Sequence, residues 1–435
     1  MRQITLTIFA FLTIFTFVNA QENNWLSKNF HTVSGDANQQ NFSDLQFLKE
    51  ELKDKKIVAI GEQTHKDGSS FEARNRLIQF LISEMGYEAI LFEAGMFDVG
   101  YGAKRYKESN DILKLRYGLW AFWSVTKQNQ SLFPFLKNQI DKGSDLDFDG
   151  FDCKITSYAY PQKYLKYLDT LVQNTDSQIL TNSIYTNYQK IWTKIINGKG
   201  TRAELPKLSK KEINALNLGS ELVVKTLAAK YPFYSQMVKM NDKGILIYAN
   251  KSILSLLFNK KLVHKLNNER DILMADNLNY LLENKYKDKK VILFGATYHF
   301  IKNNNQIVRV GKFPIPIETS IVMGDLLQNK YQKDIYTIGF TANKGAFGNS
   351  MKPKKIKPAS ANSIEKYLLD NGKKDGLLIL KDYDQNDDLV NKNITMRLFS
   401  YSSSVASKDW SKVLDAVFFI DEMKPIQWLK ASEIK

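Results

Sequence analysis

Polar side chains suited to acid–base chemistry stand directly after several short apolar runs of this chain. Two of the four histidines and three carboxylates are placed in this way. They are Glu62 and His65 after run 57–60, Glu93 after run 89–92, Asp152 after run 146–151, and His299 after run 291–294. The carboxyl ends of parallel strands meet at one edge of an α/β sheet, where ligands bind. If these runs are neighbouring parallel strands, we expect the five side chains to converge on a functional site.

A histidine beside carboxylates favours two kinds of chemistry. In general-base hydrolysis, a neutral imidazole takes a proton from water while a carboxylate holds the ring and stabilises the imidazolium. In a metal site, the same side chains bind Zn, Mn or Fe. A serine nucleophile is disfavoured because the chain contains no G-x-S-x-G turn. Gly61 is expected to turn the backbone off its strand and so present Glu62 and His65 at the mouth of the sheet.

The elements that must position these residues follow from the apolar pattern. Continuous short runs suit strands that are buried on both faces, and the further runs are 336–340, 376–380 and 416–420. A helical stripe over 70–86 follows the first run, with Ser69 or Ser70 as its expected cap and Gly86 as its stop. Such alternation predicts an α/β fold with a mainly parallel central sheet flanked by helices.

The middle of the chain has a different pattern, which divides the sequence into segments. We expect a large helical insertion that covers one end of the sheet and contains one possible strand at 245–248. Residues 352–363 are rich in Pro and Lys and are expected to form a loop. The predicted segments are a signal peptide at 1–20, a first α/β half at 21–160, the insertion at 161–266, and a second α/β half at 267–435.

The N-terminus has the features of a secretory signal. Arg2 precedes an apolar stretch over 4–18, and Val18-Asn19-Ala20 is a small-residue cleavage site. The stretch is shorter than the roughly 20 apolar residues that span a bilayer. We expect cleavage near Ala20, a secreted or periplasmic protein and no stable membrane anchor; the alternative is an uncleaved N-terminal anchor.

Composition excludes several classes of protein. The chain is 43% apolar, which is enough for a sizeable core, and its single cysteine, Cys153, excludes an internal disulfide and cysteine-based metal clusters. The net charge of +15 comes from lysines interleaved with acids, and no nucleic-acid motif accompanies them. We interpret the charge as a solvated surface and expect no nucleic-acid partner. No sequence feature predicts an oligomeric state.

Taken together and in order, these motifs resemble the erythromycin esterase family. The similar stretches are AIGEQTH at 59–65, FEARNRLIQFLISEMGYEAILFEAG at 71–95, LW at 119–120, FDGFD at 148–152, RDILMADNLNYLL at 270–282, VILFGATYHF at 291–300, YTIGFTANKGAF at 336–347 and DAVFFIDEMKPI at 415–426. The resemblance extends over roughly residues 55 to 428. It implies a metal-independent hydrolase without a cofactor, acting on a small-molecule ester or macrolactone.

The resemblance also implies roles for individual residues. His65 would be the general base, and Glu62 and Glu93 would orient the base or the water. Arg74 would hold this acidic cluster and could stabilise developing negative charge, and His299 matches the last histidine of the family's H-N-x-H block. The candidate substrate contacts are Arg270, which opens the family's R-D block, together with Asp152, Trp120 and Tyr298.

The sequence departs from the family pattern at two places. Ala296 stands where the first histidine of the H-N-x-H block is expected, and alanine cannot donate, accept or shuttle a proton. Lys66 replaces a glycine after His65, and Ser69-Ser70 replace an acidic–aromatic pair. The alternative function is therefore a secreted protein that binds a small ligand or metal on the same fold, with little or no esterase activity.

Overall fold

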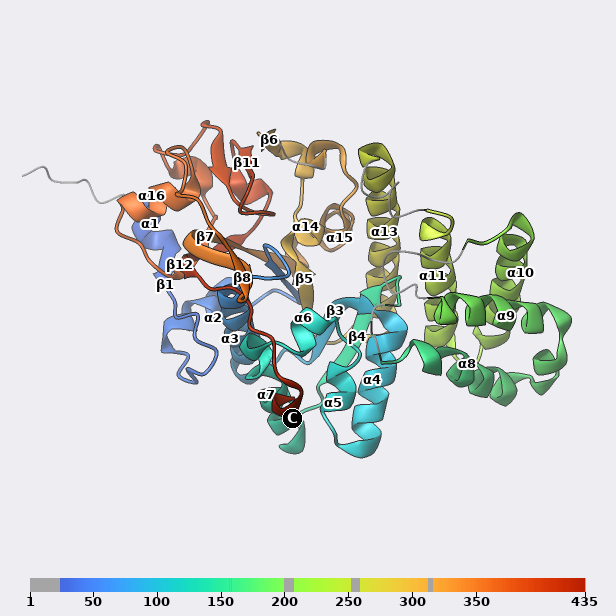
Figure 1. Ribbon diagram of the computed structural model, residues 1–435. Coiled ribbons are helices and arrows are strands. Elements are labelled where there is room, and N and C mark those ends of the chain that lie inside the picture. Colours follow the sequence, from blue (N-terminus) through green and yellow to red (C-terminus); the bar gives the residue numbers. More distant parts are fainter. Residues whose placement is uncertain are drawn as a thin grey trace, which may run out of the picture.

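A computed structural model describes residues 24–434 apart from 156, 158, 199–206, 252–258 and 312–315 (Figure 1). The expected signal peptide and its cleavage site lie outside the described residues. Among the described helices, none combines the length and the apolar character needed to cross a membrane.

A mixed sheet of mainly parallel strands forms the centre of the molecule (Figure 1). The strand order is β1-β9-β12-β7-β2-β5-β3-β4, and β8 pairs with the end of β7. The strands from β12 to β4 are parallel to their neighbours, whereas β9, β1 and β8 are antiparallel. Their bounds are β1 Phe30–Thr32, β2 Ile57–Glu62, β3 Ala89–Gly95, β4 Asp147–Asp152, β5 Val291–Ala296, β7 Ile335–Asn349, β8 Lys352–Lys355, β9 Gly376–Ile379 and β12 Ala416–Met423. The expected fold class is confirmed.

Helices cover both faces of the sheet. Val58 and Ile60 of β2 join one core cluster with Leu77, whereas Ile57 and Ala59 join a second cluster on the other face. This alternation within a continuous apolar run is what a doubly buried strand requires. The helices are α1 Asn24–Asn29, α2 Phe47–Glu51, α3 Gly68–Met85, α4 Met96–Ser109, α5 Leu113–Arg116, α6 Ala121–Ser124, α7 Leu132–Asp141, α8 Pro161–Thr175, α9 Ser183–Asn197, α10 Lys210–Leu227, α11 Pro232–Tyr248, α13 Lys260–Tyr280, α14 Thr297–Phe300, α15 Met323–Tyr331 and α16 Ile364–Asp370. A small second sheet contains β10 Ile394–Met396, β11 Ser404–Ser407 and β6 Val308–Val310.

The middle of the chain is helical. Figure 1 shows α8 to α11 grouped on one side of the molecule, with α13 between this group and the sheet. Helix α13 packs against the edge strand β4 and runs without interruption across residue 266. The possible strand at 245–248 is wrong, because these residues end α11. The polar residues Asn241 and Asp242 lie on the buried face of α11 and conceal its helical period in the sequence.

Two local expectations at element ends are also wrong. The N-cap of α3 is Asp67, so Ser69 and Ser70 lie inside the helix, although Gly86 ends it with a left-handed φ of 69° as expected. The first residues of the expected loop 352–363 form β8, which pairs antiparallel with β7. Its side chains are exposed, so this edge ribbon has no apolar alternation to reveal it.

Candidate active site

The strand order brings the predicted polar residues to one edge of the sheet. Strands β2, β5, β3 and β4 are parallel neighbours, so their carboxyl ends lie side by side. Glu62 ends β2 and lies in register with Ala296, the last residue of β5. Glu93 lies near the end of β3, and Asp152 ends β4. The edge therefore presents a row of three carboxylates with Ala296 between the first two.

Gly61 serves close packing and not a turn. It lies inside β2, and a β-carbon at this position would come within 2.5 Å of the Thr297 Cα. The hydroxyl of Thr297 donates to the Gly61 carbonyl oxygen at 2.5 Å, which joins α14 to the end of β2. The expectation that Gly61 turns the chain outward is wrong. Glu62 is consequently fully buried, and only His65 reaches the surface, with 43% of its side chain exposed.

Three donors converge on the buried Glu62 carboxylate. His65 Nδ1 lies 2.9 Å from Oε1, and Trp123 Nε1 donates to the same oxygen at 3.1 Å. Arg74 donates to Oε2. The His65 ring stacks on Phe122 at a centroid distance of 4.5 Å. Because an ionised carboxylate only accepts hydrogen bonds, Nδ1 must carry the proton, and the lone pair of the neutral ring is on Nε2.

Arg74 bonds the Glu62 oxygen that His65 does not contact. Its side chain is fully buried, and its guanidinium carbon lies 3.5 Å from the centroid of the Phe294 ring. Burial lowers the pKa of Arg74, and the neighbouring Glu62 carboxylate opposes that shift. This position suits a residue that orients Glu62, and the buried Arg74 side chain has no exposed surface for a substrate.

A second group of charged residues surrounds Arg270. This arginine, from α13, donates to Glu93 Oε1 at 2.8 Å and to both oxygens of Asp152, at 3.2 and 2.7 Å. The other Glu93 oxygen accepts from the Ala296 amide at 2.9 Å. Burial alone would raise the pKa of Glu93, but His299 and Arg270 lower it well below its usual value. One guanidinium thus bridges the Glu93 and Asp152 carboxylates.

His299 connects this group to a carboxylate on the same helix as Arg270. Its Nδ1 lies 2.8 Å from Asp271 Oδ1, and its Nε2 lies 3.3 Å from Glu93 Oε1. Burial alone would lower the pKa of His299, but the Asp271 and Glu93 carboxylates raise it to about 9. At neutral pH His299 is therefore a cation, unsuited to act as a base but able to donate hydrogen bonds.

Comparison with known proteins agrees with the motifs of the sequence. The family model described as erythromycin esterase matches residues 82–423, which is most of the chain. The chain belongs to the erythromycin esterase family. YbfO of Bacillus subtilis, a protein named as a hydrolase, is 26% identical over 361 residues, which cover 78% of this chain and 76% of that protein.

Solved structures share the fold of this family member at low sequence identity. A Bacillus cereus protein superposes with a TM-score of 0.75 at 18% identity, covering 94% of this chain and 99% of the other. A histidine-to-asparagine mutant of the erythromycin esterase EreC in its open conformation gives 0.66 at 17% identity, covering 91% and 98%. A succinoglycan biosynthesis protein gives 0.71 at 17% identity, covering 96% and 99%.

The structure places Trp120 at the cluster and sets the Tyr298 ring edge-on to His299, at a centroid distance of 5.1 Å. Trp120 Nε1 donates to the Glu93 carbonyl oxygen at 2.9 Å, beside Phe122. The Tyr298 ring packs against Phe399, and its hydroxyl oxygen is buried. A substrate contact by Tyr298 stays a prediction.

Sequence reasoning missed three side chains that complete the erythromycin esterase-like cluster. Trp123 and Asp271 hold Glu62 and His299, respectively. Lys154 follows β4, and its Nζ lies 4.2 Å from the centroid of the Tyr248 ring. Burial and then Arg270 lower the pKa of Lys154 to about 8. Asp271 could have been found from its place beside Arg270, whereas Trp123 and Lys154 have no distinguishing sequence spacing.

The raised pKa of His299 predicts a loss of stability at alkaline pH. The folded pKa of about 9 lies above the ordinary value of 6.5, so His299 contributes stability below pH 6.5 that is lost as the pH rises through 9. Between these values we expect the wild type to lose on the order of 3 kcal/mol more than His299→Gln. Urea unfolding at several pH values measures this difference. His264→Gln, a change outside the cluster on α13, is the matched control; equal losses in all three proteins would contradict the prediction.

Proposed function

We propose that this protein hydrolyses a carboxylic ester or lactone, with His65 as the general base. The observation that carries the proposal is the pairing of His65 Nδ1 with the buried Glu62 carboxylate, which fixes the ring and its tautomer. Among the described residues, Nε2 has no hydrogen-bond partner, and the ring is half-exposed. Membership of the erythromycin esterase family and the hydrolase name of the Bacillus subtilis relative support a hydrolytic reaction.

The chemistry proceeds through proton transfer at Nε2. The neutral imidazole takes a proton from water as the water oxygen adds to the ester carbonyl carbon. The Glu62 carboxylate stabilises the imidazolium that forms, as the aspartate does in a Ser-His-Asp triad. When the C–O bond breaks, the alkoxide leaving group takes that proton back from Nε2. Arg270 and His299 are already paired with Glu93, Asp152 and Asp271, so we assign the proton transfer to the His65–Glu62 pair alone.

The substrate within the ester class depends on Ala296. This residue lies between Glu62 and Glu93, and its methyl group offers no proton donor or acceptor to a substrate there. We propose a small ester or lactone, with macrolactones as the first class to test because of the family. The test is incubation of purified protein with aryl esters and macrolactones, followed by mass spectrometry for the gain of one water. Failure of the whole panel, with ligand-dependent titration of a histidine, would favour the binding-protein alternative.

We expect ester hydrolysis to survive removal of divalent metals. Arg74 and Arg270 occupy the carboxylate oxygens of the cluster, and no group of three His, Cys, Asp or Glu among the described residues could hold a metal ion. Activity should be unchanged after dialysis against EDTA, as measured by initial rates on an aryl ester. Loss of activity that Zn or Mn restores would overturn the proposed mechanism in favour of a metal site.

We further propose that the protein is exported and cleaved near Ala20. The support is the sequence signal: a positive start, a short apolar stretch and the Val18-Asn19-Ala20 end. Mass spectrometry of the exported protein should find an N-terminus at or near Gln21. A membrane-bound product that still carries Met1 would contradict export with cleavage.

A further inference from the structure

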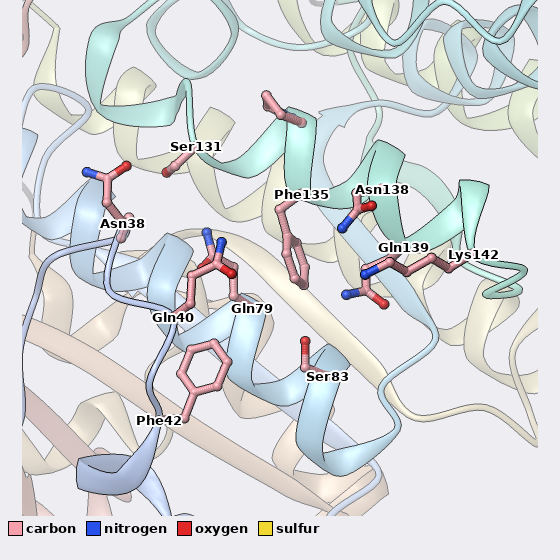
Figure 2. A pocket seen from close by; sticks show the side chains of 12 residues that line it. Asn38, Gln40, Phe42, Gln79, Ser83, Ser131, Phe135, Asn138, Gln139 and Lys142 are labelled. Atoms are coloured by element: carbon pink, nitrogen blue, oxygen red, sulfur yellow. The ribbon is translucent and has the colours of Figure 1, made fainter.

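A second pocket, separate from the cluster of Glu62, His65, Glu93 and His299, lies between residues 37–42, α3 and α7 (Figure 2). Its volume of about 370 Å³ is within the roughly 300–1,000 Å³ that small-molecule sites occupy. Of the described residues that line it, only Lys142 is charged, and its side chain is exposed. The pocket shares no lining residue with the cluster, and the proposed esterase mechanism does not use it.

Two polar side chains of the pocket have unused hydrogen-bonding capacity. Gln79, on α3, is 2% exposed, and its amide makes no hydrogen bond with the described residues. The Ser131 hydroxyl is also buried without a partner among them. Figure 2 shows the Gln79 side chain and the Phe135 ring pointing into the space between α3 and α7. A buried polar group is rarely left unpaired, so a ligand that bonds the enclosed Ser131 hydroxyl would gain binding energy, and the Gln79 amide lines the same pocket and can bond that ligand.

The loop that forms one wall of the pocket is fixed in place by Arg76. This arginine is 1% exposed and lies one helical turn before Gln79. It donates to the carbonyl oxygens of Ser34 at 2.9 Å and Asn41 at 2.8 Å, and to the Asp44 carboxylate at 2.6 Å. The wall is therefore organised before a ligand arrives, which lowers the entropy cost of binding.

We propose that this pocket binds a small neutral polyhydroxylated ligand of the size of a mono- or disaccharide. Each amide offers both a donor and an acceptor, as do the hydroxyl groups of a sugar. Gln40, Gln79, Asn138 and Gln139 supply such amides from the loop, α3 and α7. The rings of Phe42 and Phe135 can cover the apolar C–H face of a sugar ring. A charged ligand would find no buried counter-ion among the described lining residues and would lose its hydration without compensation.

Calorimetric titration of the full protein with glucose, galactose, N-acetylglucosamine, maltose and lactose tests this proposal. We expect saturable binding of at least one sugar. Gln79→Leu should weaken it by about three- to tenfold, the effect of one net hydrogen bond. Because Gln79 has no protein partner to lose, this variant should keep the thermal stability of the wild type. Lys137→Ala, a change on α7 outside the lining of the pocket, is the matched control and should bind as the wild type does.

Three outcomes would overturn the proposal. The first is the absence of saturable binding by any of the five sugars. The second is sugar binding that is undiminished in a well-folded Gln79→Leu protein. The third is binding of a capped dipeptide in place of the sugars, with the same dependence on Gln79. That result would show that the side-chain amides of the pocket recognise a peptide backbone.

Discussion

Replacing His65 by alanine is expected to lower kcat by about 10²–10⁴-fold, the usual effect of removing a general base, with little change in KM. The effect falls on kcat because the imidazole accepts the proton only as the transition state forms. The Glu62 carboxylate would keep Arg74 and Trp123 as donors, so the fold should not depend on His65. Initial rates on an aryl ester measure the loss, and circular dichroism checks the fold.

His264→Ala is the matched control for this experiment. His264 lies on α13, and its described polar contact is with Ser320, outside the cluster. Near wild-type kcat is expected for this variant. A well-folded His65→Ala protein with the activity of the wild type would remove His65 from the mechanism, and equal losses in both variants would indicate a general effect of histidine removal.

Replacing Arg270 by methionine is expected to lower the free energy of unfolding by about 3–5 kcal/mol, the usual effect of removing one partner of a buried ion pair. The variant leaves the buried carboxylates of Glu93 and Asp152 without the guanidinium that bridges them. The pKa of Glu93 should rise, since Arg270 is one of the groups that lower it. Stability should therefore be lost most strongly at neutral and alkaline pH, where Glu93 is ionised.

Arg309→Met is the matched control for the loss of an arginine ion pair. Arg309 pairs with Glu318 at 2.6 Å, but both side chains are about one-third exposed. A pair of this kind contributes about 0–1 kcal/mol. Urea unfolding at pH 7 compares the two variants. If Arg270→Met and Arg309→Met lower the free energy of unfolding by the same small amount, the prediction is contradicted. Water or a rearranged side chain would then replace Arg270 as the partner of the two carboxylates.

The sequence alone determined the class of the fold and the edge at which the site lies. Short apolar runs predict strands buried on both faces, because a strand with one face in water would alternate apolar and polar residues. A residue that follows a parallel strand must lie at the carboxyl edge, so Glu62, Glu93, Asp152 and His299 could be assigned to one region. The family was equally recognisable, since motifs such as AIGEQTH at 59–65 keep their order along the chain.

Local patterns were insufficient where polar residues are buried. The apolar segment 245–248 predicts a strand because Asn241 and Asp242, on the buried face of α11, hide the helical period. Gly61 by itself predicts a turn, because no local signal indicates that the Thr297 Cα lies within 2.5 Å of the place where a β-carbon of residue 61 would be. Both errors arise from contacts between residues distant in the sequence, which residue types do not reveal.

Only the tertiary structure decided which side chains pair at the site. The last of its four strands in the sequence, β5, lies between β2 and β3, so Ala296 separates Glu62 from Glu93. Helix α13 then brings Arg270 to Glu93 and Asp271 to His299, and His299 becomes a cation. His65, in contrast, is held by Glu62. Strand order and helix packing depend on how much apolar surface the whole core buries. The spacing of residues along the chain reflects only local geometry.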